Sequence, residues 1–453
     1  MKPTALRILL NGIGVTAIPD AIVGDVVIDS RKVKPGDLFI AIAGDNFDGN
    51  DFAAAALRAG AVAAVVSRRT EGAGEQILVS DTRAALRGIA GNYRSRFSFR
   101  SVGVTGSVGK TTTKEMTSVM LSRFGRTLKT IGNLNNQIGL PMTMFRLDDD
   151  TQYAAIEMGM TDFGEVGNLS RVLRPDVGIV TRIGISHIEY LKTQENILKA
   201  KLEIADGMPP DGIMVLNAAD SLLMANRSLV THRVVTFAGE EGIEADVMTR
   251  GIRQGLESTE FTIVDREAGS FRAVVPTIGL HNVADAVAAY TAVTRLGLDP
   301  QRAVDGLPDY VPAGMRQRIV DFNGVTVVED CYNAAPESMK ASLGILAQLP
   351  CAGLRVAVLG NMNELGDEAE KQHRIVGIEA ARDGIDVLLC RGRDTGAMAE
   401  AARASGVTRV ECFETNEEIA DYLKKLLGRG DCVLFKASRT MKFEEIIEVL
   451  YKG

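Results

Sequence analysis

"GVTGSVGKTTTKEM" (residues 103–116) places a glycine-rich turn and Lys110 between a short apolar run and a predicted helix. Glycines in such a turn let the backbone point its N–H groups inward, and the lysine is placed to reach the β- and γ-phosphates of a nucleotide. The hydroxyl of Thr111 is placed to hold Mg²⁺ at the start of the helix. Val104 stands where the strict P-loop has its first glycine, so this is the shorter form T-G-S-V-G-K-T. We predict a phosphate-binding loop, with a plain glycine turn as the alternative.

Short apolar runs with helical stretches between them surround this loop and predict an α/β fold. The spacing is typical of a parallel sheet with crossover helices. The runs are "VGVT" (102–105), "YAAIEMGM" (153–160), "VGIVTRIG" (177–184) and "GIMVLNAAD" (212–220). Similar runs before and after them, with one alanine-rich helix at "NDFAAAALRAG" (50–60), extend the pattern to both ends.

The length of 453 residues suggests about three domains. Prolines and a glycine in "LPDYVPAGMRQR" (307–318) mark the second boundary and a plausible hinge. We expect a small α/β domain over residues 1–98, a central P-loop parallel-sheet domain over 99–312, and a Rossmann-like domain over 313–453. We also expect the third domain to rotate inward on binding.

The composition is that of an ordinary globular protein, with 46% hydrophobic and 24% charged residues. A net charge of −7 argues against a nucleic-acid partner held on a broad basic surface. No apolar run reaches the length of a membrane span, and the first residues do not form a secretory signal. Five widely spaced cysteines without a CxxC pair favour reduced thiols. We therefore expect a cytoplasmic protein.

Two further regions carry candidate metal ligands. Glu157 ends the run "YAAIE", at the edge where open α/β sheets bind ligands, although a solvated side chain is the plain alternative. The segment 185–204 contains His187 and, on a predicted helix, Lys199 and Lys201. Chemistry alone favours a surface helix with ordinary lysines here, because lysine repels a metal cation unless it is modified.

Several motifs together resemble the Mur ligases of bacterial cell-wall synthesis, and the resemblance runs through all three expected domains. The motifs are TGSVGKTTTK (105–114), GNLNNQIGLPMT (132–143) and EDCYNAAPESMKASL (329–343). The second and third are similar to stretches of the family member that adds D-alanyl-D-alanine. The resemblance implies an ATP-dependent ligase that joins this dipeptide to UDP-N-acetylmuramoyl-tripeptide (UDP-MurNAc-tripeptide) through an acyl phosphate.

The same resemblance assigns metal ligands. "KAKLEI" (199–204) places Lys201 where the family carries a carbamate, which converts the cation into an anion. That anion would hold a second Mg²⁺ together with His187 and Glu157, while Thr111 holds the first. Lys110, His187 and Lys201 are then the expected catalytic residues.

The resemblance also implies binding residues for the substrates. For ATP they are Gly106, Ser107, Gly109, Lys110, Thr111, Thr112, Asn282 at the adenine, Arg316 at the phosphates, and Asp330 and Asn333 at the ribose and base. For the UDP-linked peptide and D-Ala-D-Ala they are Ser30, Arg31, Asn135, Asn136, Lys436, Ser438 and Arg439. The expected protein is a monomer that uses small-molecule substrates.

Four positions depart from the family pattern, namely Val108, Arg182, Ala335 and Ala437. They affect substrate contacts rather than the metal ligands. Rival interpretations are another Mur ligase, a folylpolyglutamate synthase, a P-loop switch or small-molecule kinase, and a nucleotide-binding protein without turnover. The third peptide residue, diaminopimelate or lysine, is left open.

Overall fold

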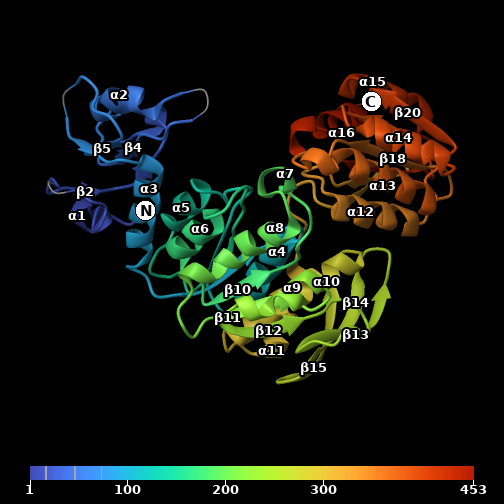
Figure 1. Ribbon diagram of the computed structural model, residues 1–453, viewed down its shortest axis with the longest axis horizontal. Coiled ribbons are helices and arrows are strands. Elements are labelled where there is room, and N and C mark those ends of the chain that lie inside the picture. The colour runs from blue at the N-terminus through green and yellow to red at the C-terminus, as the bar shows by residue number, and fades with distance from the viewer. Residues whose placement is uncertain (16–17, 45–46, 73, 453) are drawn as a thin grey trace.

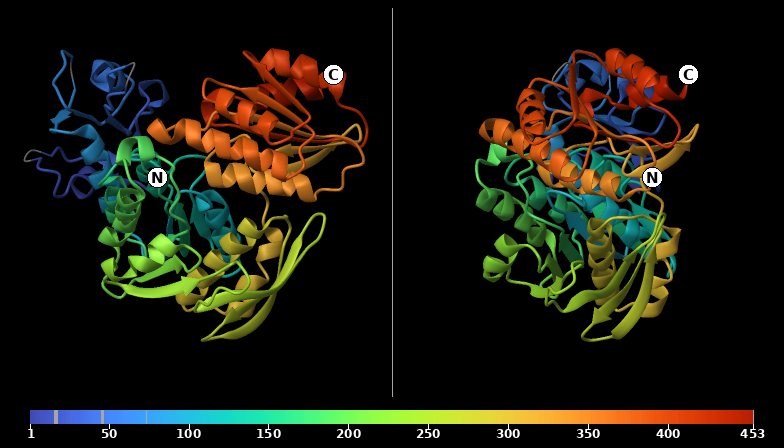
Figure 2. Two further views of the ribbon diagram at one scale, coloured as in Figure 1. Left: turned by 45° about the vertical axis from the view of Figure 1, so that its right-hand side comes forward. Right: turned by 90° about the vertical axis from the view of Figure 1, so that its right-hand side faces the viewer.

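A computed structural model describes residues 1–15, 18–44, 47–72 and 74–452. The chain forms three α/β bodies in sequence order, which Figure 1 shows as the blue N-terminal part, the green and yellow central part and the red C-terminal part. Figure 2 shows the C-terminal part stacked over the central part. The α/β class expected from the sequence is confirmed.

The N-terminal body contains a four-stranded parallel sheet in the order β3-β4-β5-β6. Its strands are β3 (Val26–Val27), β4 (Leu38–Ile40), β5 (Ala63–Val66) and β6 (Gln76–Leu78), and β1 (Thr4–Ala5) pairs separately with β2 (Ile22–Val23). The helices are α1 (Leu6–Leu9), α2 (Ala53–Arg58) and α3 (Thr82–Arg94). The expectation of one helix here was wrong.

Helix α3 buries an uncharged face made of Thr82, Ala85, Leu86, Ile89, Ala90 and Tyr93, and its arginines lie outside that face. Asp81 caps it by accepting hydrogen bonds from the backbone N–H groups of Arg83 and Ala84, at 2.8 and 3.1 Å. Tyr93 near its end donates a 2.9 Å hydrogen bond to the carbonyl of Leu147 in the central body. The helix therefore joins the first body to the second.

The central body is built on a nine-stranded sheet in the order β15-β14-β13-β12-β11-β10-β7-β9-β8. The expected strands appear as β7 (Arg100–Thr105), β9 (Tyr153–Glu157), β10 (Val177–Val180) and β11 (Ile213–Asn217), all in parallel register. The other strands are β8 (Thr127–Lys129), β12 (Arg233–Phe237), β13 (Val247–Gln254), β14 (Thr259–Asp265) and β15 (Gly269–Val275). The antiparallel extension β13-β14-β15 was not expected.

Helices cover both faces of this sheet. Side chains of β9 alternate between them: Ala155 packs with α4 and α10, while Ala154 and Ile156 pack with α6 and α8. The helices are α4 (Lys110–Ser122), α5 (Gly139–Met144), α6 (Glu165–Leu173), α7 (Ile188–Leu191), α8 (Gln194–Leu202), α9 (Ser221–Ala225), α10 (Leu280–Arg295) and α11 (Pro300–Val304). Within the described residues, no helix combines the length and apolarity needed to cross a bilayer.

The C-terminal body is a six-stranded sheet in the order β16-β17-β21-β18-β19-β20, parallel except for β16. The strands are β16 (Arg318–Phe322), β17 (Val325–Glu329), β18 (Arg355–Gly360), β19 (Val387–Arg391), β20 (Arg409–Phe413) and β21 (Cys432–Lys436). The helices are α12 (Pro336–Gln348), α13 (Ala369–Arg382), α14 (Thr395–Ala404), α15 (Asn416–Leu426) and α16 (Glu444–Tyr451). Helix α12 lies on the side that faces the central body (Figure 1).

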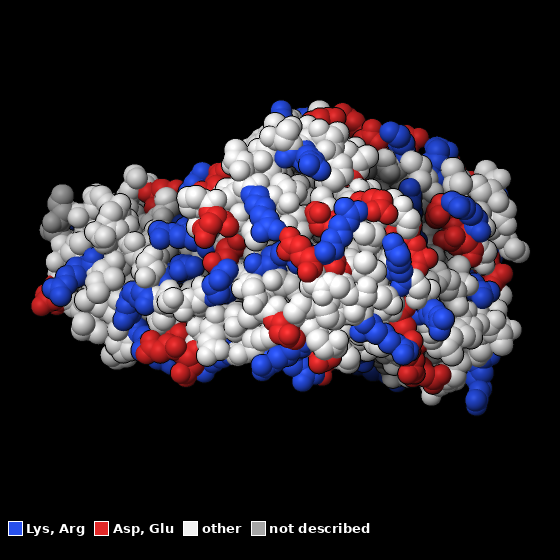
Figure 3. Space-filling view, turned by 90° about the horizontal axis from the view of Figure 1, so that it is seen from below, with Lys and Arg blue, Asp and Glu red and all other residues white. Residues whose placement is uncertain are grey.

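Charged residues of both signs are interspersed over the face shown in Figure 3. Exposed ion pairs of the protein include Arg233 with Glu267 at 2.7 Å and Arg171 with Asp206 at 2.7 Å. This face therefore presents no continuous field of one sign.

Candidate functional site

A cleft of about 1320 Å³ lies between the central and C-terminal bodies. The loops that follow β7, β9, β10 and β11 line one side of it, which is the carboxyl edge of the central sheet. Most of the residues expected at the site line the cleft. They are Ser107, Gly109, Lys110, Thr111, Thr112, Asn135, Asn136, Glu157, His187, Lys201, Asn282, Arg316, Asp330, Asn333, Lys436, Ser438 and Arg439.

The glycine-rich loop has the backbone that a phosphate cradle needs. Gly109 has a φ of 84° and directly precedes α4, and Gly106 has a φ of 149°. A Cβ atom at Gly106 would collide with Oγ1 of Thr181. The end of β10 supports the loop from behind, because Ser107 N–H donates to the carbonyl of Arg182 at 2.8 Å. Arg182, which departs from the family pattern, thus contacts the loop through its backbone carbonyl. Another residue at this position would make the same contact.

The side chain of Lys110 folds back over this loop. Its Nζ donates to the carbonyls of Gly106 at 2.7 Å and Ser107 at 3.2 Å. Burial lowers the pKa of Lys110, partly offset by the negative charge of Glu157. The ammonium is therefore held at the loop, where an arriving phosphate would displace the two weaker carbonyl partners.

Thr111 and Glu157 meet at the start of α4. Oγ1 of Thr111 donates to Oε2 of Glu157 at 2.8 Å, and Nδ2 of Asn135 donates to Oε1 at 2.7 Å. Glu157 is 2% exposed and its backbone N–H donates to Oγ1 of Thr130 at 2.9 Å. Thr111 and Glu157, far apart in sequence, thus bring oxygen atoms to one point, which suits a hard cation such as Mg²⁺.

The side-chain nitrogen of Lys201 is buried, and among the described residues it forms no ion pair with a carboxylate. Lys201 is 1% exposed and lines the cleft from α8. Burial lowers its pKa well below the usual lysine value, and the charge of Lys110 lowers it further. Without an ion pair to offset it, burial favours the neutral amine more than in a lysine exposed to water.

His187 is held by a residue that sequence reasoning missed. Its Nδ1 lies 2.5 Å from Oε2 of Glu364, which belongs to the loop after β18 in the C-terminal body. The close imidazole of His187 lowers the pKa of Glu364. Nothing in the sequence around Glu364 indicated this contact, because the two residues are far apart along the chain. In the described ranges, no cluster of three or more His, Cys, Asp or Glu side chains forms a ready metal site.

Gln317, also missed, connects the residues expected at the nucleotide. Its Oε1 accepts a 2.8 Å hydrogen bond from Nδ2 of Asn282 and lies 2.9 Å from Nε2 of His281. Its backbone N–H donates to Oδ1 of Asp330 at 3.2 Å. Nζ of Lys436 pairs with Oδ2 of the same aspartate at 2.6 Å. Asn282, Asp330 and Lys436 are thus joined in one network at the boundary between the two bodies.

Two guanidinium groups face one aromatic ring on the C-terminal side of the cleft. Cζ of Arg316 lies 4.3 Å from the centre of the Tyr332 ring, and Cζ of Arg439 lies 5.7 Å from it. Arg439 also pairs with Glu444 at 2.7 Å. Oγ of Ser438 accepts a 2.9 Å hydrogen bond from the N–H of Asn363. This corner of the cleft is therefore basic and suits an anionic group.

Ser30 and Arg31 are not among the residues that line the cleft. Arg31 instead forms a two-pronged pair with Asp29 in its own loop, with Nε–Oδ1 and Nη2–Oδ2 distances of 2.9 Å each. Its side chain is 87% exposed. The N-terminal body reaches the cleft through Arg83 at the start of α3, which the sequence did not single out.

Three stretches match known family domains. Residues 104–293 match "Mur ligase middle domain", 315–439 match "Mur ligase, glutamate ligase domain", and 23–94 match "Mur ligase family, catalytic domain". The chain is 37% identical over 437 residues to UDP-N-acetylmuramoyl-tripeptide–D-alanyl-D-alanine ligase of Bacillus subtilis, covering 95% of this chain and 94% of that protein.

Two solved structures share the whole architecture. MurF from Acinetobacter baumannii superposes with a TM-score of 0.91 at 30% identity, covering 100% of both chains. MurF ligase from Thermotoga maritima in complex with ADP superposes with a TM-score of 0.85 at 27% identity, covering 94% of this chain and 97% of that one.

Proposed function

Because this chain belongs to the Mur ligase family, we propose that it joins D-alanyl-D-alanine to UDP-MurNAc-tripeptide at the expense of ATP. The family resemblance drawn from the motifs is confirmed. The product would be a precursor of peptidoglycan, formed together with ADP and phosphate. The observation that carries the proposal is the cleft itself, in which a phosphate loop, a carboxylate and an uncompensated lysine face basic groups of another body.

The chemistry begins with activation of a carboxylate. The terminal carboxylate oxygen of the UDP-linked peptide attacks the γ-phosphorus of ATP, the bond to the β–γ bridging oxygen breaks, and ADP leaves. The amine of the dipeptide then attacks the acyl carbon, loses a proton and expels phosphate. Backbone N–H groups of residues 106–112 would bind the phosphates, and Lys110 would turn from its carbonyl partners to the transferring group.

The residues at the cleft fit Mg²⁺. Oxygens of Thr111 and Glu157 converge there, Asn135 orients the glutamate, and His187 lines the same cleft. When bound, Mg²⁺ would neutralise charge on the phosphates. Lys201 would react with CO₂ as its neutral amine, forming an N–C bond and releasing a proton, and the resulting carbamate would supply a further anionic ligand.

Each of the three bodies would then bind a different substrate. Residues 1–98 would bind the UDP-linked peptide with Ser30, Arg31 and the neighbouring Arg83, residues 99–312 would bind ATP, and residues 313–453 would receive the dipeptide. Arg439 supports the last assignment, because it lies in the basic corner beside Ser438, where Arg316 is the group expected at the ATP phosphates. The protein would act as a monomer in the cytoplasm, where ATP is available.

The proposal is tested by following ADP release and product mass with the purified protein. Separate reactions contain the tripeptide substrate with diaminopimelate or with lysine at its third position, each with and without D-Ala-D-Ala. We expect product to require ATP, one of the two tripeptides and the dipeptide together, and to disappear in a Lys110→Ala variant. Transfer of glutamate to a folate would instead support the folylpolyglutamate synthase alternative. ADP release that ignores both peptides would overturn the proposal.

A further inference from the structure

The C-terminal body holds one loop of the central body at several points. This loop, residues 184–191, connects β10 to α8 and contains His187. Ile185 and Ile188 pack against the apolar core of the C-terminal body. A Cβ atom at Gly184 would lie 2.6 Å from Oε1 of Glu337 on α12, so the side chain of Glu337 lies against the backbone of Gly184. The conformation of the loop is thus tied to the position of the C-terminal body.

The contact between His187 and Glu364 lies at the centre of this interface and is strained at both ends. His187 has a φ of 67° and Glu364 has a φ of 64°, a left-handed conformation that residues other than glycine seldom adopt. The carbonyl of Glu364 also accepts a 3.2 Å hydrogen bond from the N–H of Glu189. His187 and Glu364 thus face each other across the boundary between two bodies, each in a strained backbone conformation. This indicates a functional constraint on the pair.

The pairing also decides which imidazole nitrogen is available. A carboxylate oxygen 2.5 Å from Nδ1 favours a proton on that nitrogen, and in the neutral ring this leaves the lone pair on Nε2. A carboxylate behind a ligating histidine orients the ring and raises its basicity. Both effects matter here because Mg²⁺ prefers oxygen ligands and binds imidazole weakly.

We propose that Glu364 is a positioning residue that presents Nε2 of His187 to the metal, so that docking of the C-terminal body completes the metal site. The inference rests on the proposed function, in which His187 is a metal ligand. It goes beyond that function by making metal affinity depend on the arrangement of the two bodies.

The test uses three variants of the full-length protein. Glu364→Gly removes the carboxylate and also relieves the left-handed backbone, so the substitution itself does not strain the fold. Glu364→Gln keeps the size of the side chain and a neutral acceptor. The matched control is Glu368→Gln, because Glu368 lies four residues on and pairs only locally, with Lys371 at 2.9 Å and Gln372 at 3.2 Å.

The first readout does not depend on activity. The chain has four histidines, so their ring nitrogens are resolvable in ¹⁵N NMR spectra of the protein without metal or nucleotide, and a His187→Asn variant assigns the signals. We expect the His187 proton on Nδ1 in the wild type and in Glu368→Gln. We expect it on Nε2 in Glu364→Gly. A Nδ1 proton that persists in Glu364→Gly would overturn the inference.

The second readout is the Mg²⁺ concentration for half-maximal ligation. We expect it to rise about 10- to 100-fold in Glu364→Gly and less in Glu364→Gln, while the melting temperature does not fall. An unchanged Mg²⁺ requirement, or an equal rise in Glu368→Gln, would overturn the inference. A wild-type protein that ligates nothing would instead refute the proposed function, and the NMR spectra would still decide whether Glu364 sets the His187 ring.

Discussion

Oγ1 of Thr113 donates a 2.9 Å hydrogen bond to Oδ1 of Asp285, which joins α4 to α10 directly behind the phosphate loop. The carboxyl of Asp285 is 6% exposed and lies against Gly109. Burial raises the pKa of Asp285 to about 7. The loop is therefore packed against a group that is neutral in mildly acidic solution and ionised above neutrality.

This raised pKa predicts that Asp285 destabilises the protein as the pH rises. The unfolded carboxyl ionises near 3.8 and the folded one near 7, so the unfolded chain binds fewer protons between these values and stability falls over that window. The full loss, on the order of 4 kcal/mol, is reached above pH 7. We expect Asp285→Asn to unfold at a higher temperature than the wild type at pH 8 and at nearly the same temperature at pH 4. Equal differences at both pH values would contradict this assignment.

Gly109 is predicted to be required for ATP binding. A Cβ atom there would collide with Oδ1 of Asp285, and the φ of 84° adds strain for any other residue. We expect Gly109→Ala to weaken ATP binding at least about 10-fold in calorimetry, because the loop must shift to make room. The control is Gly91→Ala in α3, where a Cβ meets nothing within 4 Å and should raise stability by about 1 kcal/mol. Unchanged ATP affinity in Gly109→Ala would show that the loop tolerates the side chain.

Lys201 is predicted to be essential as a carbamate rather than as an ammonium. We expect Lys201→Ala to lower kcat at least about 100-fold, because an anionic metal ligand is lost. Short-chain carboxylic acids should restore part of the activity by supplying an anion in the vacated space. The control is Lys199→Ala, because Lys199 is exposed on the same helix and should be replaceable without loss. Full activity of Lys201→Ala, with no gain from added acids or bicarbonate, would refute the carbamate.

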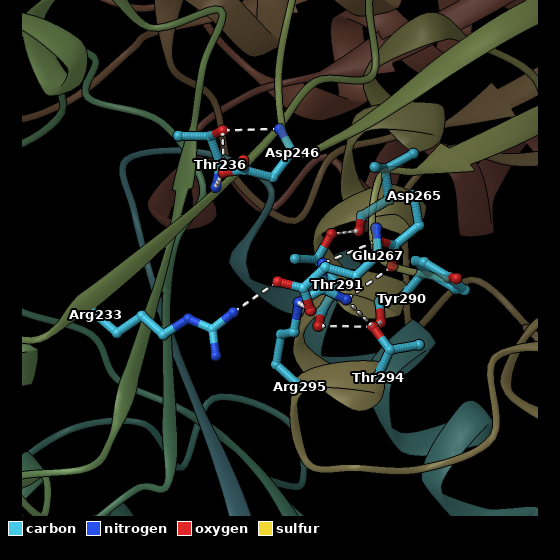
Figure 4. Close-up of polar contacts among 10 residues, drawn as sticks. Arg233, Thr236, Asp246, Asp265, Glu267, Tyr290, Thr291, Thr294 and Arg295 are labelled. Carbon is cyan, nitrogen blue, oxygen red and sulfur yellow. Dashed lines mark hydrogen bonds and ion pairs between the residues drawn. The ribbon is translucent and has the colours of Figure 1, made fainter. Parts of the chain in front are cut away.

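The buried ion pair between Arg295 of α10 and Asp265 of β14 is expected to stabilise the packing of the antiparallel strands against α10. Figure 4 shows Arg295 reaching Asp265, with Nη1–Oδ2 and Nη2–Oδ1 distances of 2.7 and 3.0 Å. Burial raises the pKa of Asp265, but the hydrogen bonds from Arg295 outweigh it and leave the pKa lowered. Arg295→Met should cost about 3–5 kcal/mol, because the Asp265 charge stays buried without its partner.

Arg233→Met supplies the comparison for that pair, since Arg233 joins exposed Glu267 at 2.7 Å and should contribute under about 1 kcal/mol. Urea unfolding followed by circular dichroism measures both variants. Similar losses in the two would mean that burial does not govern the strength of the Asp265 pair.

Local patterns were enough to predict the elements nearest the chemistry. The run "YAAIE" became β9 with Glu157 at its end, and "TGSVGK" became the loop before α4. Strands β13 to β15 were missed because polar residues interrupt them, so they do not look like the continuous apolar runs of the parallel strands. In β14, for example, buried residues alternate with half-buried ones. Glu364 and Gln317 were missed for another reason. Each acts through contacts with distant segments, and no periodicity encodes such contacts.

The sequence by itself determined the phosphate loop, the α/β class and the family, because glycine positions, strand-like runs and motifs are properties of short segments. Only the tertiary structure decided what those segments meet. It left Lys201 buried without an acid, placed Asp285 behind Gly109, and paired His187 with Glu364 across two bodies. The reason is physical: burial and charge pairing depend on which surfaces pack together, and a linear pattern carries no such distances.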